Sequence, residues 1–167
     1  MSETVQNNIQ NDEKTVVIDD INAVAATKGR IIGVDFGDVR TGIALSDVSR
    51  FLASGQGFCR VGGLAKTAGE IARVAKENNA VAAVVGLPRN MDGTEGSRAD
   101  RCREFASLLR TLTGIPVMMA DERLTTVAAS RYLNETDTRG SRRKSVIDSL
   151  SAEIILQNTL DRLKNMK

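Results

Sequence analysis

The sequence of 167 residues contains no histidine and no tryptophan, and only 3% of its residues are aromatic. Without histidine there can be no His-based metal site and no triad with a histidine base. So few aromatic side chains argue against a surface that stacks bases on an aromatic platform. Chemistry must therefore rest on carboxylates, lysines or hydroxyls, and carboxylates favour hard cations such as Mg²⁺ or Mn²⁺.

Cysteines and long apolar runs are also scarce. The two cysteines, Cys59 and Cys102, match no zinc-binding spacing. Cys102 falls on the apolar face of an expected helix, so we expect a buried thiol there. No apolar run approaches the length of a membrane span, and the polar start lacks the basic region of a signal peptide. We therefore expect a cytoplasmic protein that does not enter a membrane.

The composition is that of a soluble globular domain, with 41% apolar and 26% charged residues. Net charge is +2, but residues 1–28 hold five acids and two bases, so the remainder carries about +5. We expect residues 1–28 to be a polar, partly disordered extension, with disorder over Met1–Asn11 and a short strand or helix within Val16–Ala26. Residues 29–167 are expected to form one domain.

Hydrophobic periodicity divides this domain into alternating elements. Strands are expected over Arg30–Phe36, Val39–Ser46, Phe51–Val61, Val81–Leu87 and Ile115–Ala120. Helices are expected over Leu64–Asn78, Ser97–Thr111, Thr125–Leu133 and from Ser145 to about Leu163, with a polar loop over Asn134–Lys144. The order predicts an α/β fold: a mixed five-stranded sheet, three antiparallel strands plus two parallel, with helices on both faces.

An aspartate stands inside the first expected strand, in the run R-I-I-G-V-D-F-G. A buried carboxylate is costly unless it is paired, hydrogen-bonded or bound to a metal. We interpret Asp35 as a metal ligand. Gly33 and Gly42 are expected to leave room beside it for a ligand to approach.

Carboxylates at two further places in the chain are candidate partners of Asp35. Glu122 lies just past the last expected strand, where ligands of open α/β sheets bind. Its neighbour Asp121 is an equally good candidate from the residues alone. Asp148 is expected in the first turn of the final helix, on one face with Ser151 and Ala152, which would let the helix approach the sheet. A favourable contact with the helix dipole is the alternative explanation for Asp148.

The pattern D-x-G-x-x-x-x-G, formed by Asp35, Gly37 and Gly42, is also similar to the phosphate-binding hairpin of actin-like ATPases and sugar kinases. By itself the motif leaves both interpretations open. That fold needs two such lobes, and this chain has the length of one. The ATPase is therefore the less favoured alternative.

Four ordered motifs, V-D-F-G-D-V-R-T-G-I-A, V-V-G-L-P-R-N-M-D-G-T, D-E-R-L-T-T and V-I-D-S-L-S-A, resemble the YqgF family over about residues 30–156. The resemblance implies a ribonuclease H-like fold, related to Holliday junction resolvases, and an acidic triad at Asp35, Glu122 and Asp148. Many RuvC-type resolvases carry a further acid where this chain has Ser151. The number of bound metal ions, one or two, therefore stays open.

The resemblance implies a Mg²⁺- or Mn²⁺-dependent endonuclease, a hydrolase that processes the 5′ end of pre-16S ribosomal RNA in ribosome biogenesis. The alternatives are a resolvase of four-way DNA and a non-catalytic ribosome-assembly factor. Expected partners are pre-rRNA or branched DNA and the small-subunit precursor. The chain could act as a monomer or a homodimer, since nothing in the sequence identifies an interface.

Basic residues near the acidic motifs are candidates for holding a nucleic-acid backbone. They are Arg89, Arg98, Arg123, Arg139, Arg142, Arg143 and Lys144. A solvated loop is the alternative for the cluster before Asp148. The loop Pro88–Gly96 is expected to form a rim over the site, or else an ordinary surface connection.

Overall fold

The computed structural model describes residues 18–60, 62–122 and 140–166, and for residues 140–148 it describes the backbone alone. Its elements are α2 (Ile21–Ala25), β1 (Ile31–Asp35), β2 (Thr41–Ser46), β3 (Ala53–Cys59), α3 (Leu64–Glu77), β4 (Ala82–Leu87), α4 (Ser97–Thr113), β5 (Val117–Asp121) and α6 (Gly140–Asn165). All five strands, α3 and α4 lie where predicted, with their ends shifted by at most two residues. The expected helix Thr125–Leu133 and the stretch Met1–Asn11 lie outside the described residues. Of the helices described, none is long and apolar enough to cross a membrane.

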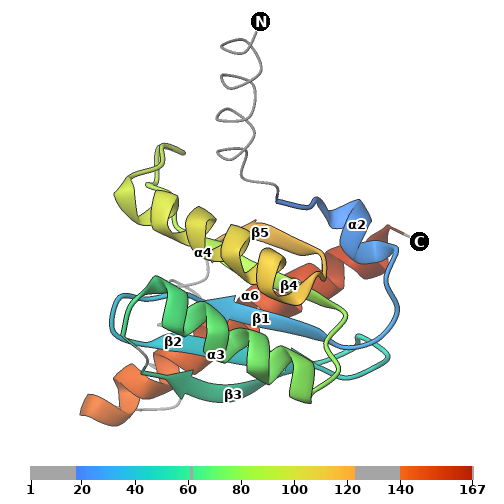
Figure 1. The fold of residues 1–167 in the computed structure, drawn as a ribbon, viewed down its shortest axis with the longest axis horizontal. Coiled ribbons are helices and arrows are strands. Elements are labelled where there is room, and N and C mark those ends of the chain that lie inside the picture. Colours follow the sequence, from blue (N-terminus) through green and yellow to red (C-terminus); the bar gives the residue numbers. More distant parts are fainter. Residues whose placement is uncertain (1–17, 61, 123–139, 167) are drawn as a thin grey trace, which may run out of the picture.

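A five-stranded sheet in the order β3-β2-β1-β4-β5 forms the centre of the fold (Figure 1). The strands β1, β2 and β3 pair antiparallel, whereas β4 and β5 join β1 in parallel. The predicted mixed sheet is therefore confirmed. Because β1, β4 and β5 run in one direction, they end at the same edge, where Asp35, Leu87 and Asp121 lie. We call this the carboxyl edge of the sheet.

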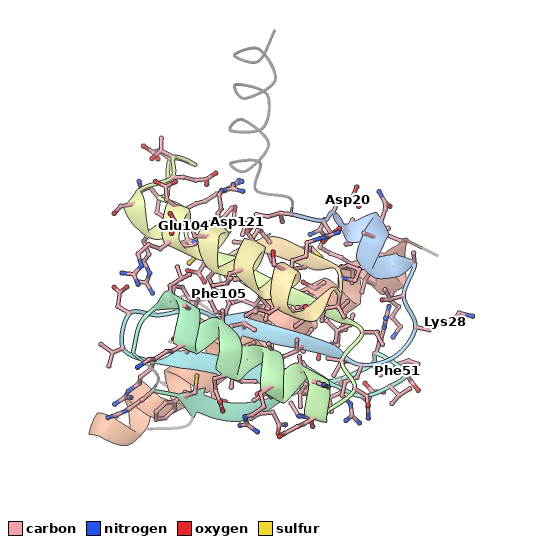
Figure 2. The ribbon with its side chains drawn as sticks, viewed as in Figure 1. Asp20, Lys28, Phe51, Glu104, Phe105 and Asp121 are labelled. Carbon is pink, nitrogen blue, oxygen red and sulfur yellow. The ribbon has the colours of Figure 1, made fainter. Side chains whose placement is uncertain are left out.

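Helices cover both faces of the sheet, with α3 and α4 on one face and α6 on the other (Figure 1). Side chains alternate along β1, so that Ile32 and Val34 enter the core under α3 and α4, whereas Ile31 packs toward α6. On α4, the fully buried Phe105 stacks on Phe36 with ring centroids 4.5 Å apart (Figure 2). Burial on both faces explains why the central strands β1 and β4 are nearly continuous apolar runs.

The segment before β1 attaches to the outer side of β5. Asp19 forms a parallel bridge with Met118. Its carboxylate accepts hydrogen bonds from the backbone N–H of Val117 at 3.0 Å and from Arg110 at 2.7 Å. The short element expected here is thus a single bridge followed by α2. It covers part of an edge strand that would otherwise present unpaired backbone groups.

The final helix is longer than predicted. We expected a polar loop over Asn134–Lys144 and a helix that starts at a Ser145 cap, whereas α6 begins at Gly140 and ends at Asn165. Arginine and lysine are good helix formers, so the basic run before Ser145 can extend the helix although it carries no apolar stripe. Asp148 therefore lies in the third turn of α6 and not in the first. The helix-dipole explanation for Asp148 consequently fails, because that effect is confined to the first turn.

Gly33 serves the packing of α6 and not access to Asp35. A Cβ atom at position 33 would lie 2.8 Å from the Cβ of Leu156 and 3.1 Å from the carbonyl oxygen of Ala152. The expectation that Gly33 leaves room for a ligand is therefore wrong, because α6 fills that room. The small Ala152, fully buried, lets the helix backbone come this close to β1.

Replacing Gly33 by alanine should destabilise the fold by about 1–3 kcal/mol, because the added methyl group overlaps atoms of a packed helix. The matched control is Gly69→Ala in α3, where a new Cβ atom meets nothing within 4 Å. That variant should be about 0.5–1 kcal/mol more stable, since alanine favours a helix interior over glycine. Urea denaturation of both variants tests the contrast, and equal effects would contradict the close packing of α6 on β1.

Candidate active site

Two of the predicted carboxylates converge at the carboxyl edge. Asp35 is the last residue of β1, and Glu122 follows β5 directly, with β4 between the two strands. The hydrogen-bond ladder continues through Glu122, whose backbone N–H donates to the carbonyl oxygen of Leu87 at 3.2 Å. Parallel strands thus bring together two acids that are far apart in the sequence.

The strand geometry selects Glu122, and not Asp121, as the neighbour of Asp35. Met118 of β5 belongs to the core under α6, so Glu122, four residues later, points to that face. Asp35 points to the same face of the sheet, because it lies four residues after Ile31 along β1 and every second residue of a strand points to the same face. Asp121 points to the opposite face, where its carboxylate lies 3.8 Å from the guanidinium of Arg89. The choice that the residues alone left even is therefore decided by the alternation along β5.

A glycine in the intervening strand makes room for the Glu122 carboxylate. A Cβ atom on Gly86 of β4 would lie 2.5 Å from Oε2 of Glu122 and 2.8 Å from Cδ1 of Ile155. Glu122 can cross β4 toward Asp35 only because position 86 has no side chain. Sequence reasoning missed this role of Gly86, although a glycine inside the apolar run V-V-G-L was the available signal.

The two carboxyl groups influence each other's ionisation. Burial raises the pKa of Glu122 to about 7, and the negative charge of Asp35 adds to the rise. A hydrogen bond between the two carboxyl groups also raises the pKa, whereas the positive charge of Arg98 lowers it. Because two carboxylates this close repel when both are ionised, the metal-free pair holds a proton near neutral pH.

Cys102 of α4 is a buried thiol, as predicted. It is 2% exposed, and its sulfur lies 3.9 Å from the carbonyl oxygen of Phe36. Burial, followed by the charge of Glu122, raises the pKa of Cys102 to about 12. A thiol with so high a pKa is not ionised at neutral pH, so Cys102 is no nucleophile.

The donor set at this edge suits a hard divalent cation. Carboxylate oxygens are preferred ligands of Mg²⁺ and Mn²⁺, and such a cation can replace the proton that Glu122 and Asp35 share. Among the side chains that the structure describes, no group of three or more potential ligands lies together. The third predicted ligand, Asp148, lies outside the described side chains. The helix that carries it does reach the site, since Ile155 of α6 meets Gly86.

Two of the predicted nucleic-acid-binding residues have described side chains. Arg89 lies 3.6 Å from Glu95 and 3.8 Å from Asp121, so its charge is shared between two carboxylates. Arg98, in the first turn of α4, is close enough to Glu122 to influence its pKa. The remaining candidates lie outside the described side chains: Arg123, Arg139, Arg142, Arg143 and Lys144. The last three fall on the backbone of α6 and not, as expected, in a loop.

The loop between β4 and α4 is held in shape by its own side chains. Asn90 N–H donates to the carbonyl oxygen of Thr94 at 2.8 Å, and the Asp92 carboxylate accepts from the Thr94 N–H at 2.9 Å. Arg103 of α4 donates two hydrogen bonds, of 3.0 and 3.1 Å, to Glu95. A structured loop therefore stands next to Glu122 at the carboxyl edge, and its function as a rim stays a prediction.

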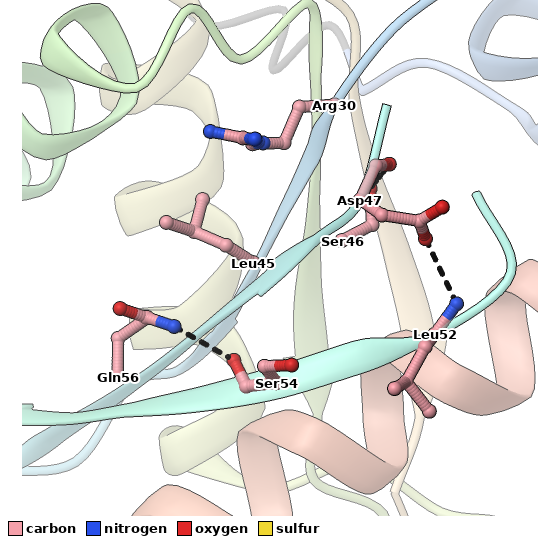
Figure 3. Close-up of a pocket in the computed structure, with 7 residues that line it drawn as sticks. All are labelled: Arg30, Leu45, Ser46, Asp47, Leu52, Ser54 and Gln56. Carbon is pink, nitrogen blue, oxygen red and sulfur yellow. Dashed lines mark hydrogen bonds between the residues drawn. The ribbon is translucent and has the colours of Figure 1, made fainter. Parts of the chain in front are cut away.

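A hollow of about 300 Å³ lies at the other end of the sheet (Figure 3). It is lined by residues from the start of β1, the end of β2 and the start of β3, namely Arg30, Leu45, Ser46, Asp47, Leu52, Ser54 and Gln56. The carboxylate of Asp47 accepts hydrogen bonds from the backbone of Phe51 at 2.8 Å and of Leu52 at 2.9 Å, so it serves the β2–β3 turn. The hollow contains none of the predicted site residues and is separate from the carboxylate pair.

Comparison with known proteins identifies the family. A family model described as "RuvX: Holliday junction resolvase" matches residues 29–162. The chain belongs to the RuvX family. This is the YqgF family that the four motifs resemble, so the predicted relationship is confirmed. The match includes every described strand and all but the last few residues of α6.

Two relatives that share a name match this chain at the same level of identity. A protein of Paracoccus denitrificans named "Putative pre-16S rRNA nuclease" is 44% identical over 136 residues, which cover 81% of this chain and 86% of that protein. A protein of the same name from Clostridioides difficile is 44% identical over 133 residues, covering 80% of this chain and 94% of the relative.

A solved structure supports the fold. The structure described as "T. thermophilus RuvC in complex with Holliday junction substrate" superposes with a TM-score of 0.52 and 12% identity, covering 81% of this chain and 96% of that chain. At this identity the likeness establishes the fold alone. The RuvX chain thus has the RuvC-like, ribonuclease H-like fold that the motifs implied.

Proposed function

We propose that this protein is a metal-dependent endonuclease that hydrolyses phosphodiester bonds in the 5′ region of pre-16S ribosomal RNA. The observation that carries the proposal is the carboxylate pair, Asp35 and Glu122, at the carboxyl edge of a RuvX-family fold. The name that the curated relatives share supports the choice of RNA substrate. Membership of this family along nearly the whole domain favours a nuclease over an actin-like ATPase.

Asp35, Glu122 and Asp148 are proposed to hold Mg²⁺ or Mn²⁺. When bound, one or two such ions lower the pKa of an attacking water and stabilise the leaving oxygen of the phosphodiester. Asp35 lies nearest the middle of the sheet and is the proposed shared ligand. Glu122 must release its proton before it can bind a cation, so we expect the affinity for Mg²⁺ or Mn²⁺ to rise as the pH increases toward about 7.

Positive charges around the pair would counter the repulsion between an anionic substrate and an acidic site. Arg98 is proposed to contribute because its charge already acts on Glu122. Arg89, shared between Glu95 and Asp121, is better suited to holding the β4–α4 loop in place. The proposed products are a 5′-phosphate and a 3′-hydroxyl.

Resolution of four-way DNA junctions is the second candidate function. The description of the RuvX family as a Holliday junction resolvase favours it. The same carboxylates would perform the same hydrolysis, so the difference lies in the nucleic acid that is bound. A resolvase that cuts two symmetric strands would also need a dimer.

Cleavage assays on both substrates test the proposal. Purified protein with Mg²⁺ or Mn²⁺ should cut a pre-16S fragment that contains the 5′ maturation region, and EDTA should abolish the cleavage. Preferential cutting of a four-way DNA junction would contradict the RNA substrate and support junction resolution as the function. Binding of the RNA without cleavage of either substrate would contradict the nuclease proposal and favour a non-catalytic assembly factor.

A further inference from the structure

A cluster of one aromatic and two basic side chains stands at the carboxyl edge, on the far side of β2 from Asp35. The guanidinium carbon of Arg40 lies 4.9 Å from the ring centroid of Phe58, and that of Arg60 lies 5.5 Å from it. Arg40 precedes β2 and Arg60 follows β3. Because these strands are antiparallel and Thr41 pairs with Cys59, both arginines emerge at the same edge. We call Arg40, Phe58 and Arg60 the Phe58 cluster.

The strand register places this cluster in line with the carboxylate pair. Asp35 pairs with Gly42, and Gly42 pairs with Phe58. Directly paired residues point to the same face of a sheet, so Asp35 and Phe58 share the face on which α6 packs, with Gly42 between them in the strand register. Neighbouring strands are about 4.8 Å apart, which puts the two positions about 10 Å apart. A short stretch of one nucleic-acid strand can span that distance.

The ring of Phe58 contacts the guanidinium of Arg60 without neutralising its charge. Elsewhere, Arg73, Arg103 and Arg110 each form ion pairs with carboxylates, which neutralise the guanidinium charge. Arg60 is exposed and forms no ion pair with any residue that the structure describes. A cation–π contact restricts the motion of a guanidinium before any ligand binds, so less conformational entropy is lost on binding. A fixed, charged fork of N–H donors is suited to phosphate.

We propose that the Phe58 cluster binds the sugar–phosphate backbone of the substrate strand close to the bond that is cut, with Arg60 as the main phosphate contact. The proposal rests on the proposed nuclease function, because it takes the strand to lie across Asp35. It adds a binding site on β2 and β3, whereas the predicted basic residues lie on β4–α4, after β5 and on α6. Contacts to phosphate are independent of base sequence, so the cluster positions the strand and does not select it.

The test is the salt dependence of binding by Arg60→Ala. The probe is a fluorescein-labelled single-stranded RNA of about 20 nucleotides, titrated in EDTA at several NaCl concentrations and followed by anisotropy. One lost phosphate contact should lower the slope of log K against log[NaCl] by about 0.7. Affinity should fall about fivefold, the size expected for one exposed ion pair. Phe58→Leu should weaken binding without changing the slope, because both charges remain.

Arg162→Ala is the matched control, since it removes an exposed arginine from the distant end of α6. Equal effects of Arg60→Ala and Arg162→Ala on slope and affinity would overturn the proposal, because they would show only general attraction of a basic protein to RNA. In cleavage assays, Arg60→Ala should raise KM with little change in kcat. If the wild-type protein binds RNA but cleaves neither substrate, only the nuclease proposal is contradicted, and the proposed phosphate-binding role of the Phe58 cluster is not. The slope change of Arg60→Ala would then still decide whether the cluster binds phosphate.

Discussion

Replacing Asp35 by asparagine should lower kcat for the cleaved substrate by about 10³-fold or more. The substitution keeps the size of the side chain but removes a charge from the centre of the proposed metal site, and a loss of about 4 kcal/mol in transition-state stabilisation corresponds to that factor. The fold should survive, because a neutral amide in place of the Asp35 carboxylate would relieve the repulsion with Glu122. Single-turnover cleavage in Mg²⁺ or Mn²⁺ measures the effect, and thermal melting checks the fold.

Asp38→Asn is the matched control for this prediction. Asp38 lies three residues further along the same motif, is exposed, and pairs with Arg101 at 3.7 Å. An exposed ion pair of this length is worth little, so kcat should change by no more than about threefold. If Asp35→Asn kept more than about a tenth of the wild-type kcat, the assignment of Asp35 would be wrong.

Replacing Glu122 by glutamine should make the metal-free protein more stable at pH 8 but not at pH 5. Glu122 has a pKa of about 7 in the folded protein, above its ordinary value of 4.5. The folded state therefore holds a proton that the unfolded state releases, and the wild type loses stability as the pH rises from about 4.5 to 7. Glutamine does not ionise, so the variant does not lose this stability. At pH 8 its free energy of unfolding should exceed that of the wild type by about 2–3 kcal/mol.

Urea denaturation in EDTA at both pH values measures this difference. Asp121→Asn is the control, because Asp121 points to the other face of β5 beside Arg89 and its charge is the smallest of the causes that raise the pKa of Glu122, so its gain at pH 8 should be much smaller. Adding Mg²⁺ or Mn²⁺ at pH 8 should stabilise the wild type and have a much smaller effect on Glu122→Gln. A Glu122→Gln variant with the same stability profile as the wild type would contradict the coupled carboxylate pair.

Strand and helix positions were predictable because they depend on local periodicity. Continuous apolar runs marked β4 and β5, and the 3.6-residue spacing of small and apolar residues marked α3. The start of α6 was not predictable in this way. Arg142, Arg143 and Lys144 favour a helix by propensity, but the segment from Gly140 to Lys144 has no apolar stripe, so its pattern predicts a loop.

The roles of the glycines were only partly predictable. The sequence showed glycines next to Asp35 and within β4, but not what lies opposite each one. Gly33 faces Leu156 of α6, and Gly86 faces the Glu122 carboxylate. Both partners are distant in sequence, so their approach depends on how α6 and β5 pack and cannot be derived from either segment alone.

By itself, the sequence determined the family, the mixed sheet and the place of Asp35 at the end of β1, because ordered motifs and periodicity are local properties of the chain. Only the tertiary structure decided that Glu122, and not Asp121, faces Asp35. It also decided that Phe58, with its two arginines, lies at the same register position of the sheet as Asp35. These facts depend on the register between strands and on which face each side chain enters. Hydrogen bonding between segments sets both, and no single segment contains that information.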